Sequence, residues 1–339
     1  MKSSARIMSM LYVPIALSIG AFVIASWLPS FMREPVLLAL LLGFGLRRFL
    51  RAQESDQYVI RPSHIAHILI PIGIFFYAAR NVRYSGLVQS DVNTLCILVI
   101  VAVAYFLSVL ALGKIFGIPR KIRYLVATGS AVCGISAIVM TSDALDADAE
   151  EISVSVIAVS LIGMYGLFVL LPFTSALFSL LPEAFAYLAG STLQLTGLVR
   201  VIPSVVPHLT GGLSIAELAL GIKSIRYLFL IICIPLCASL LARKIHLPSA
   251  LWVYIIGGIL GSLVAGIDMA NVYASEWSTF LSVAYTIAWG AVMAAIGVST
   301  DVSALLSRSG FWALLVAGFS MCIAILTFIV SGLLLGVIA

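Results

Sequence analysis

The chain has 339 residues, of which 62% are hydrophobic and only 10% are charged, and its formal net charge is +5. Soluble domains are about 45–50% apolar and about 25% charged, so this composition excludes a soluble protein and indicates an integral membrane protein. The basic excess is small, and it gives no reason to expect a nucleic-acid partner.

Apolar segments follow one another along the whole chain. A membrane-spanning helix needs about 20 mostly apolar residues, because it must satisfy its own backbone groups in lipid. The first segment follows Lys2 and Arg6, but no A-x-A-type cleavage site comes after it, so we expect a retained helix. A single polytopic membrane domain, 1–339, is expected. The pattern predicts eleven spans, at 9–31, 35–50, 61–79, 91–113, 121–141, 152–180, 184–206, 219–242, 249–267, 277–299 and 311–338.

The distribution of Lys and Arg predicts the orientation of these spans. With the N-terminus in the cytoplasm, thirteen of these residues fall on the cytoplasmic side, and Arg200 lies within a span. The positive-inside rule therefore predicts a cytoplasmic N-terminus and an outside C-terminus in the cell inner membrane. The five residues assigned to the outer side are Arg33, Arg80, Arg83, Lys223 and Arg226.

Eleven spans divide into one extra N-terminal helix, 9–31, and two groups of five. Because five is odd, the second group runs opposite to the first, as in the inverted-topology repeats of secondary transporters. We expect a first repeat at 35–180 and a second at 184–338.

The segment 127–140, ATGSAVCGISAIVM, carries small and polar residues where a membrane helix usually carries large apolar ones. Two interpretations are open. Small residues allow close helix packing, whereas a break in the helix would point half-helix ends, with their amide groups and dipole, at an anion. The residues concerned are Gly129, Ser130, Cys133, Gly134 and Ser136.

A second cluster of this kind lies in 187–204, YLAGSTLQLTGLVRVIPS. Polar side chains in mid-span should face protein or water, because exposure to lipid is costly. Arg200 either pairs with an anionic substrate or snorkels to the outer headgroups. The candidate binding residues are Gly190, Ser191, Thr192 and Gln194.

Three further segments favour structural roles. In 291–310, Ser299 or Thr300 is expected to cap a short helix. The acidic run 142–151 reads as a solvated loop or a helix start, with a cation-attracting vestibule as the alternative. Arg80 is either an interface anchor or a cation near the broken helix.

Catalytic and metal-binding patterns are missing from the sequence. The four histidines lie near span ends, and the five cysteines fall inside predicted spans without a histidine at ligand spacing. No Ser-His-Asp set or P-loop occurs. We therefore expect no enzyme activity, no cofactor and no metal.

The stretch GSAVCGISAIV, with the acidic turn and ISVSVIAVSLIGMYGLFVLLP after it, resembles the signature of the YeiH-like bacterial inner-membrane proteins, some of which are labelled sulfate exporters. Further segments match that family in the same order, over about 36–338: LLALLLGFGLRR, FYAAR, YLAGST and AAIGVSTDVSALLSRSG.

The resemblance implies an all-α secondary transporter, similar to bile-acid-symporter and sodium–proton-antiporter (NhaA-like) folds, with two inverted repeats and discontinuous crossing helices. It places Gly129, Ser130, Cys133 and Gly134 at the crossing, Arg80 on a basic position, and Gly190, Ser191 and Thr192 on a second Gly-Ser motif. One departure stands out. Where the family has a histidine and then an acidic residue, this chain has Gln194 and Leu195, which speaks against proton coupling through that helix.

Together these patterns predict export of a small anion, of the sulfate, sulfite or organic sulfonate class, by alternating access. Ser130, Cys133 and Ser136 would face Ser191, Thr192 and Gln194, and Arg80 or Arg200 would supply positive charge. One alternative is a carrier of another organic solute coupled to H⁺ or Na⁺, with Asp143 or Asp146 at the crossing. Another is a non-transporting scaffold or sensor in the bilayer. Assembly into a homodimer is left open.

Overall fold

The computed structural model describes residues 2–28, 35–52, 62–81, 91–206, 215–242, 249–267, 273–299 and 307–337. Within these ranges every regular element is a helix. The all-α class predicted from the composition is therefore confirmed for the described part of the chain.

Helices occupy each of the ranges expected to be apolar spans. Single helices are α1 (Lys2–Trp27), α2 (Pro35–Ala52), α3 (Pro62–Asn81), α5 (Val92–Ile115), α14 (Ser249–Ile267), α15 (Tyr273–Ser299) and α16 (Arg308–Leu334). The remaining ranges hold runs of helices: α6 (Arg120–Ala131) and α7 (Ile135–Ala144); α8 (Ala149–Tyr165), η3 (Gly166–Leu170) and α9 (Leu171–Phe178); α10 (Pro182–Thr192) and α11 (Thr196–Val205); α12 (Ile215–Arg226), η5 (Tyr227–Phe229) and α13 (Leu230–Ala242).

Five of the described helical stretches are long and apolar enough to cross a membrane. They are Val92–Ile115, Ala149–Phe178, Ile215–Cys237, Thr279–Val298 and Arg308–Leu334. The full count of eleven crossings and the inverted repeat stay predictions. In an inverted repeat, equivalent helices are expected to be interrupted. Here the interruption in 121–141 falls in the fourth segment of the first expected repeat, and that in 184–206 falls in the first segment of the second. The two interruptions are therefore not at equivalent positions and do not themselves indicate a repeat.

The chain divides into two compact units. Unit 1 comprises Met1–Val82, Asp146–Ser153 and Pro248–Ala304, and unit 2 comprises Arg83–Leu145, Val154–Leu247 and Leu305–Ala339. Both units are therefore assembled from segments that are distant in the sequence.

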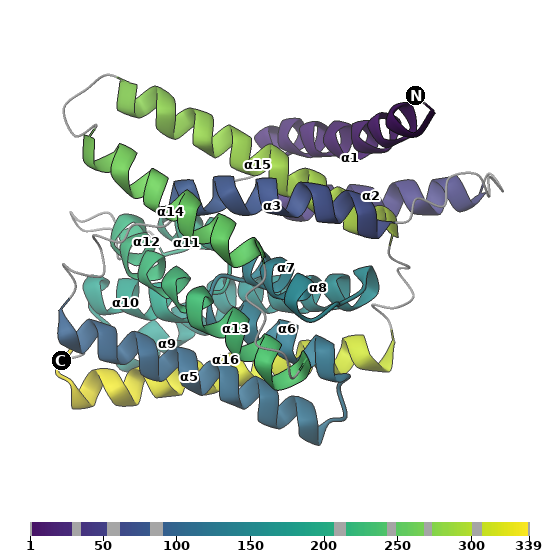
Figure 1. The fold of residues 1–339 in the computed structure, drawn as a ribbon. Helices are drawn as coiled ribbons and strands as arrows, with labels where there is room; N and C mark the ends of the chain where they lie inside the picture. Colours follow the sequence, from purple (N-terminus) through teal and green to yellow (C-terminus); the bar gives the residue numbers. More distant parts are fainter. Residues whose placement is uncertain are drawn as a thin grey trace. The chain divides into compact units, whose positions relative to one another are not determined.

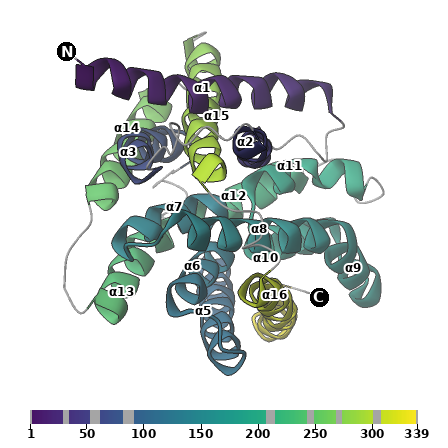
Figure 2. The ribbon, with the colours of Figure 1, turned by 90° about the vertical axis from the view of Figure 1, so that its right-hand side faces the viewer.

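In unit 1, α15 is the central helix. It packs against α1, α2 and α3, and α14 packs on the other side of α3. Figure 2 shows α15 between α2 and α3, with α1 crossing it. The buried aromatic side chains Tyr77 and Trp289 meet at this centre, with ring centroids 6.3 Å apart.

The contact between α2 and α15 is made by backbone rather than by large side chains. A Cβ atom on Gly297 would overlap the Leu40 carbonyl oxygen and would lie 3.1 Å from the Cα of Gly43. Small residues permit this close approach of two membrane helices. In the segment 291–310, Gly297 therefore has a packing role, whereas Thr300 lies outside the described residues.

Replacing Gly297 with alanine is expected to destabilise the protein by about 1–3 kcal/mol, because the added methyl group must push two backbones apart. Thermal unfolding in detergent would measure the loss. Gly20 in α1 is the matched control, since nothing lies within 4 Å of a Cβ atom built there. An equal melting temperature for both alanine variants would contradict close packing at Gly297.

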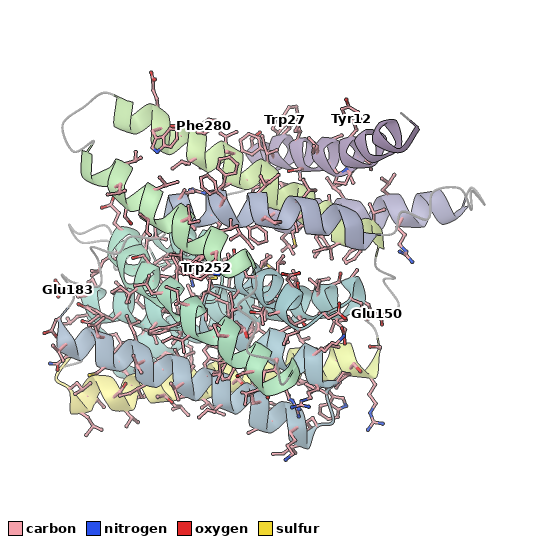
Figure 3. The ribbon with its side chains drawn as sticks, viewed as in Figure 1. Tyr12, Trp27, Glu150, Glu183, Trp252 and Phe280 are labelled. Atoms are coloured by element: carbon pink, nitrogen blue, oxygen red, sulfur yellow. The ribbon has the colours of Figure 1, made fainter. Side chains whose placement is uncertain are left out.

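In unit 2, α5 and α16 run side by side (Figure 1) and α16 also contacts α6 and α10. The outward faces of these helices are apolar: Leu107 of α5 is 56% exposed and Phe319 of α16 is 54% exposed. In unit 1, Tyr12 and Trp27 likewise point away from α1 (Figure 3), with 63% and 87% of their surfaces exposed. Large exposed apolar surfaces mark contact with lipid or a partner, which agrees with a membrane protein.

Candidate functional site

The helix in 127–140 is broken. The helix α6 ends at Ala131 and α7 starts at Ile135, so Val132, Cys133 and Gly134 form the break. Gly134 has φ 74°, in the left-handed region that glycine adopts without steric cost. Its N–H donates to the Gly129 carbonyl at 2.8 Å, which closes the last turn of α6. The discontinuous helix expected here is confirmed.

Close packing and a helix break both occur in this segment, at different glycines. A Cβ atom on Gly129 would lie 2.7 Å from the Ile138 side chain, so Gly129 lets α7 fold back onto α6. Ser130, Cys133 and Ser136 are all buried. Gly129 thus provides the close packing and Gly134 the helix break, which were the two interpretations left open by the sequence.

The second cluster also lies at a break. Between α10 and α11, Leu193 and Leu195 are extended, with ψ 136° and 132°. Gly190 lies before the break, and a Cβ atom there would be 2.7 Å from the Ala219 carbonyl oxygen of α12. The Ser191 and Thr192 hydroxyls both donate to the Leu188 carbonyl, at 3.1 and 2.6 Å. Each hydroxyl oxygen can therefore only accept a further hydrogen bond.

The two breaks contact each other. A Cβ atom on Gly134 would lie 2.8 Å from the Leu195 side chain and 3.2 Å from the Gln194 carbonyl oxygen. The structure therefore brings together the two small-residue clusters that the sequence places about 60 residues apart, at a point where both chains leave helical geometry.

Arg226, the last residue of α12, donates to carbonyls on both sides of this contact. On α6 its Nη2 donates to Ser130 O at 3.0 Å and its Nε to Ala131 O at 3.3 Å. On α10 and the following break, its Nη1 donates to Gly190 O at 3.1 Å and Leu193 O at 2.9 Å. The last four carbonyls of a helix lack intrahelical partners and carry its negative dipole end. One guanidinium group therefore caps two half-helices.

Lys223 lies one turn before Arg226 on α12 and donates from Nζ to the same Leu193 carbonyl. Both cations have no exposed surface. Among the residues whose side chains the structure describes, no Asp or Glu is buried. Burying a charge is costly unless it is paired, and here backbone carbonyl dipoles accept from both side chains. The break is thus rich in positive charge.

The other two half-helices begin at the breaks without a cap. No side chain caps the N-terminus of α7 after Gly134 or that of α11 after Leu195. The first N–H groups of a helix have no intrahelical acceptor and carry the positive dipole end. The negative ends are therefore neutralised by Arg226 and Lys223, whereas neither N-cap residue places a side-chain hydrogen bond on the positive ends.

Two buried side-chain oxygens near the breaks lack a hydrogen-bond partner. They are Ser130 Oγ and Gln194 Oε1. The amide nitrogen of Gln194 is satisfied, since it donates to the Tyr105 hydroxyl at 2.6 Å. Buried polar atoms in native structures usually have partners, so these two indicate a place where a ligand or water completes the hydrogen bonding.

Lys223 and Arg226, which the charge count assigns to the outer side, are fully buried in unit 2. The membrane side on which they lie stays a prediction. A signal for burial existed in the sequence: the two cations stand three residues apart inside an apolar run, LALGIKSIRYLFLII. Charged residues within a membrane segment point to a functional site, and the count by sides passed over that signal.

Of the two arginines expected to serve the site, Arg80 belongs to the other unit, and the side chain of Arg200 is not among those described. Arg80 belongs to unit 1, where its guanidinium carbon is 5.0 Å from the centre of the Tyr285 ring, and both breaks belong to unit 2. Arg200 is on α11, but its side chain is outside the described residues. Their roles toward a substrate stay predictions.

The acidic run after α7 starts a helix, as the sequence favoured. The Asp148 carboxylate accepts from the Glu151 N–H at 2.8 Å, and the Glu151 carboxylate accepts from the Asp148 N–H at 3.0 Å, which is a reciprocal capping box. Asp146 is exposed. Asp143 is nine residues beyond Gly134, about 13 Å along α7 at 1.5 Å per residue. Asp143 is therefore at the end of α7 that is far from the break at Gly134.

Comparison with known proteins points to one group of membrane proteins. The family model described as Conserved hypothetical protein 698 matches residues 9–317. A UPF0324 membrane protein from Archaeoglobus fulgidus is 31% identical over 194 residues, 57% of this chain and 55% of that protein. A UPF0324 membrane protein from Yersinia pestis is 25% identical over 296 residues, 80% of this chain and 75% of that protein.

The UPF0324 inner membrane protein YeiH from Escherichia coli K12 is 30% identical over 130 residues, 37% of this chain and 36% of YeiH. The matched part of the chain therefore spans about half the length of the archaeal relative and three quarters of that of the Yersinia relative. No solved structure matches the chain.

Proposed function

Because the chain belongs to the family described as Conserved hypothetical protein 698, the UPF0324 membrane proteins, we propose that it is a secondary transporter for a small anion. The substrate class is sulfate, sulfite or an organic sulfonate, and the mechanism is alternating access. The relatives' names support a protein embedded in the membrane, with YeiH called an inner membrane protein. The substrate and the mechanism are the proposal.

The observation that carries this proposal is the charge at the two breaks. Lys223 and Arg226 are completely buried, two uncapped half-helix N-termini start there, and no buried carboxylate occurs among the described side chains. In a low-dielectric interior such an excess of positive charge attracts an anion strongly. A solute cation would be repelled from the same place.

The proposed topology places this site near the middle of the membrane. It has eleven crossings with a cytoplasmic N-terminus and an outside C-terminus, and oppositely oriented halves at 35–180 and 184–338. The acidic residues Asp146, Asp148 and Glu150, all exposed, follow α7 on the proposed outer side. Their negative charge would repel anions arriving from outside, which supports export rather than uptake.

A flux assay in reconstituted liposomes tests the function. The wild-type protein is expected to move at least one of sulfate, sulfite and an organic sulfonate. Replacing Lys223 with methionine should lower that flux about tenfold or more, because a charge-assisted hydrogen bond contributes about 1.5–3 kcal/mol. Lys114→Met is the control, since Lys114 is exposed at the end of α5. Flux that requires a cation and does not depend on any of the anions would contradict the proposal.

A further inference from the structure

The side chain of Gln194 is fixed in one orientation at the break between α10 and α11. Its Nε2 faces the Tyr105 hydroxyl at 2.6 Å and the Met321 sulfur at 4.0 Å. A hydroxyl group accepts or donates, but a thioether sulfur only accepts. The amide nitrogen, which only donates, therefore belongs on this side. The amide oxygen must point the other way.

The oxygen of this amide points at a glycine. A Cβ atom built on Gly163 of α8 would lie 3.0 Å from Gln194 Oε1 and 3.1 Å from a methyl group of Leu198. Because residue 163 has no side chain, only the backbone of α8 approaches this oxygen at that residue. Gln194 has no exposed surface, and its Oε1 has no hydrogen-bond partner. A buried acceptor without a donor is costly, because it has lost its bonds to water.

We propose that Gln194 Oε1 accepts a hydrogen bond from a donor group on the transported anion. The site then selects anions that carry a hydroxyl or acid proton over anions of the same charge that carry none. Within the sulfonate class, this means hydroxysulfonates. The inference rests on the proposed anion transport and adds the chemistry of the substrate to it.

A metal cation is the other group that would suit a lone amide oxygen, and the electrostatics of the break disfavour it. The neighbouring residue, Leu193, has its carbonyl oxygen already bound by both Lys223 and Arg226. A sodium ion at Gln194 would face the buried guanidinium of Arg226, which stays charged, beside the buried Lys223 Nζ donor. A donor that belongs to an anion is attracted by that charge and still satisfies Oε1.

The test uses two sulfonates that differ only in the donor: 2-hydroxyethanesulfonate and ethanesulfonate. In liposomes holding the wild-type protein, flux of the hydroxylated anion is expected to exceed flux of ethanesulfonate about tenfold, the equivalent of one ordinary buried hydrogen bond. In Gln194→Met, which keeps the length of the side chain but removes the acceptor, the ratio should fall to about one. The melting temperature of each variant, with and without each sulfonate, shows whether it is folded and binds.

Two glycine variants sharpen the result. Gly163→Ala places a methyl group beside Oε1 and should lower the ratio, whereas Gly221→Ala, where nothing lies within 4 Å of the added atom, should leave the ratio unchanged. Equal wild-type flux of the two sulfonates would overturn the role of Gln194 while leaving anion transport in place. Flux that requires sodium and shows no donor preference would favour a bound cation instead. Absence of flux for every anion would overturn the proposed function itself.

Discussion

Replacing Arg226 with methionine is expected to abolish anion flux and to destabilise the protein by about 3–5 kcal/mol, the cost of leaving buried partners uncompensated. The guanidinium group donates to Ser130 O, Ala131 O, Gly190 O and Leu193 O. Methionine would remove this donor from the Ser130, Ala131 and Gly190 carbonyls and leave Leu193 O to Lys223 alone, with two negative helix ends facing each other. Thermal unfolding in detergent and flux in liposomes measure the two effects.

Two further variants separate the shape of Arg226 from its charge. Arg226→Lys keeps the charge but offers three donors on a single atom, so it should recover part of the stability and little of the flux. Arg120→Met is the surface control, since Arg120 also donates to a carbonyl, Leu240 O at 2.9 Å, but at an exposed position. Its loss should cost at most about 1 kcal/mol. A melting temperature of Arg226→Met as high as that of Arg120→Met would contradict the capping role.

Replacing Gly134 with alanine is expected to have a comparably large effect, a loss of about 2–6 kcal/mol together with most of the flux. Two costs combine. A residue with a side chain at φ 74° is strained by about 1–3 kcal/mol, and the added carbon would overlap the Leu195 side chain and crowd the Gln194 backbone, which adds about 1–3 kcal/mol. The contact between the two breaks should be pushed apart.

Gly117 provides the matched control for that experiment. It lies in the exposed turn before α6 with φ 70°, and nothing lies within 4 Å of a Cβ atom built on it. Gly117→Ala therefore carries the backbone strain without the overlap, and it should lose about 1–3 kcal/mol and keep its flux. If Gly134→Ala matched Gly117→Ala in both stability and flux, contact between the breaks would have no importance for function.

Sequence alone determined the features that depend on local composition. Long apolar runs predicted the helices, because every span in lipid has to satisfy its own backbone. The Gly and Ser content of 127–140 made a helix break one of two interpretations, and glycine permits the backbone geometry seen at Gly134. At 187–204 it marked a polar cluster in mid-span. The acidic run 142–151 was interpreted as a solvated loop or a helix start, and Asp148 and Glu151 within it begin α8.

Only the tertiary structure decided what the breaks contain. From the sequence, Lys223 and Arg226 counted as cations of the outer side. In the structure their side chains donate to backbone carbonyls that lie 30 to 96 residues away in the chain. The same holds for Gln194, whose oxygen is left without a donor only because Tyr105 and Met321 hold its nitrogen. The physical reason is range: hydropathy and backbone preference act between neighbours in the sequence. The pairing of a buried charge or amide is set by whichever distant carbonyl or hydroxyl the fold brings within hydrogen-bonding distance.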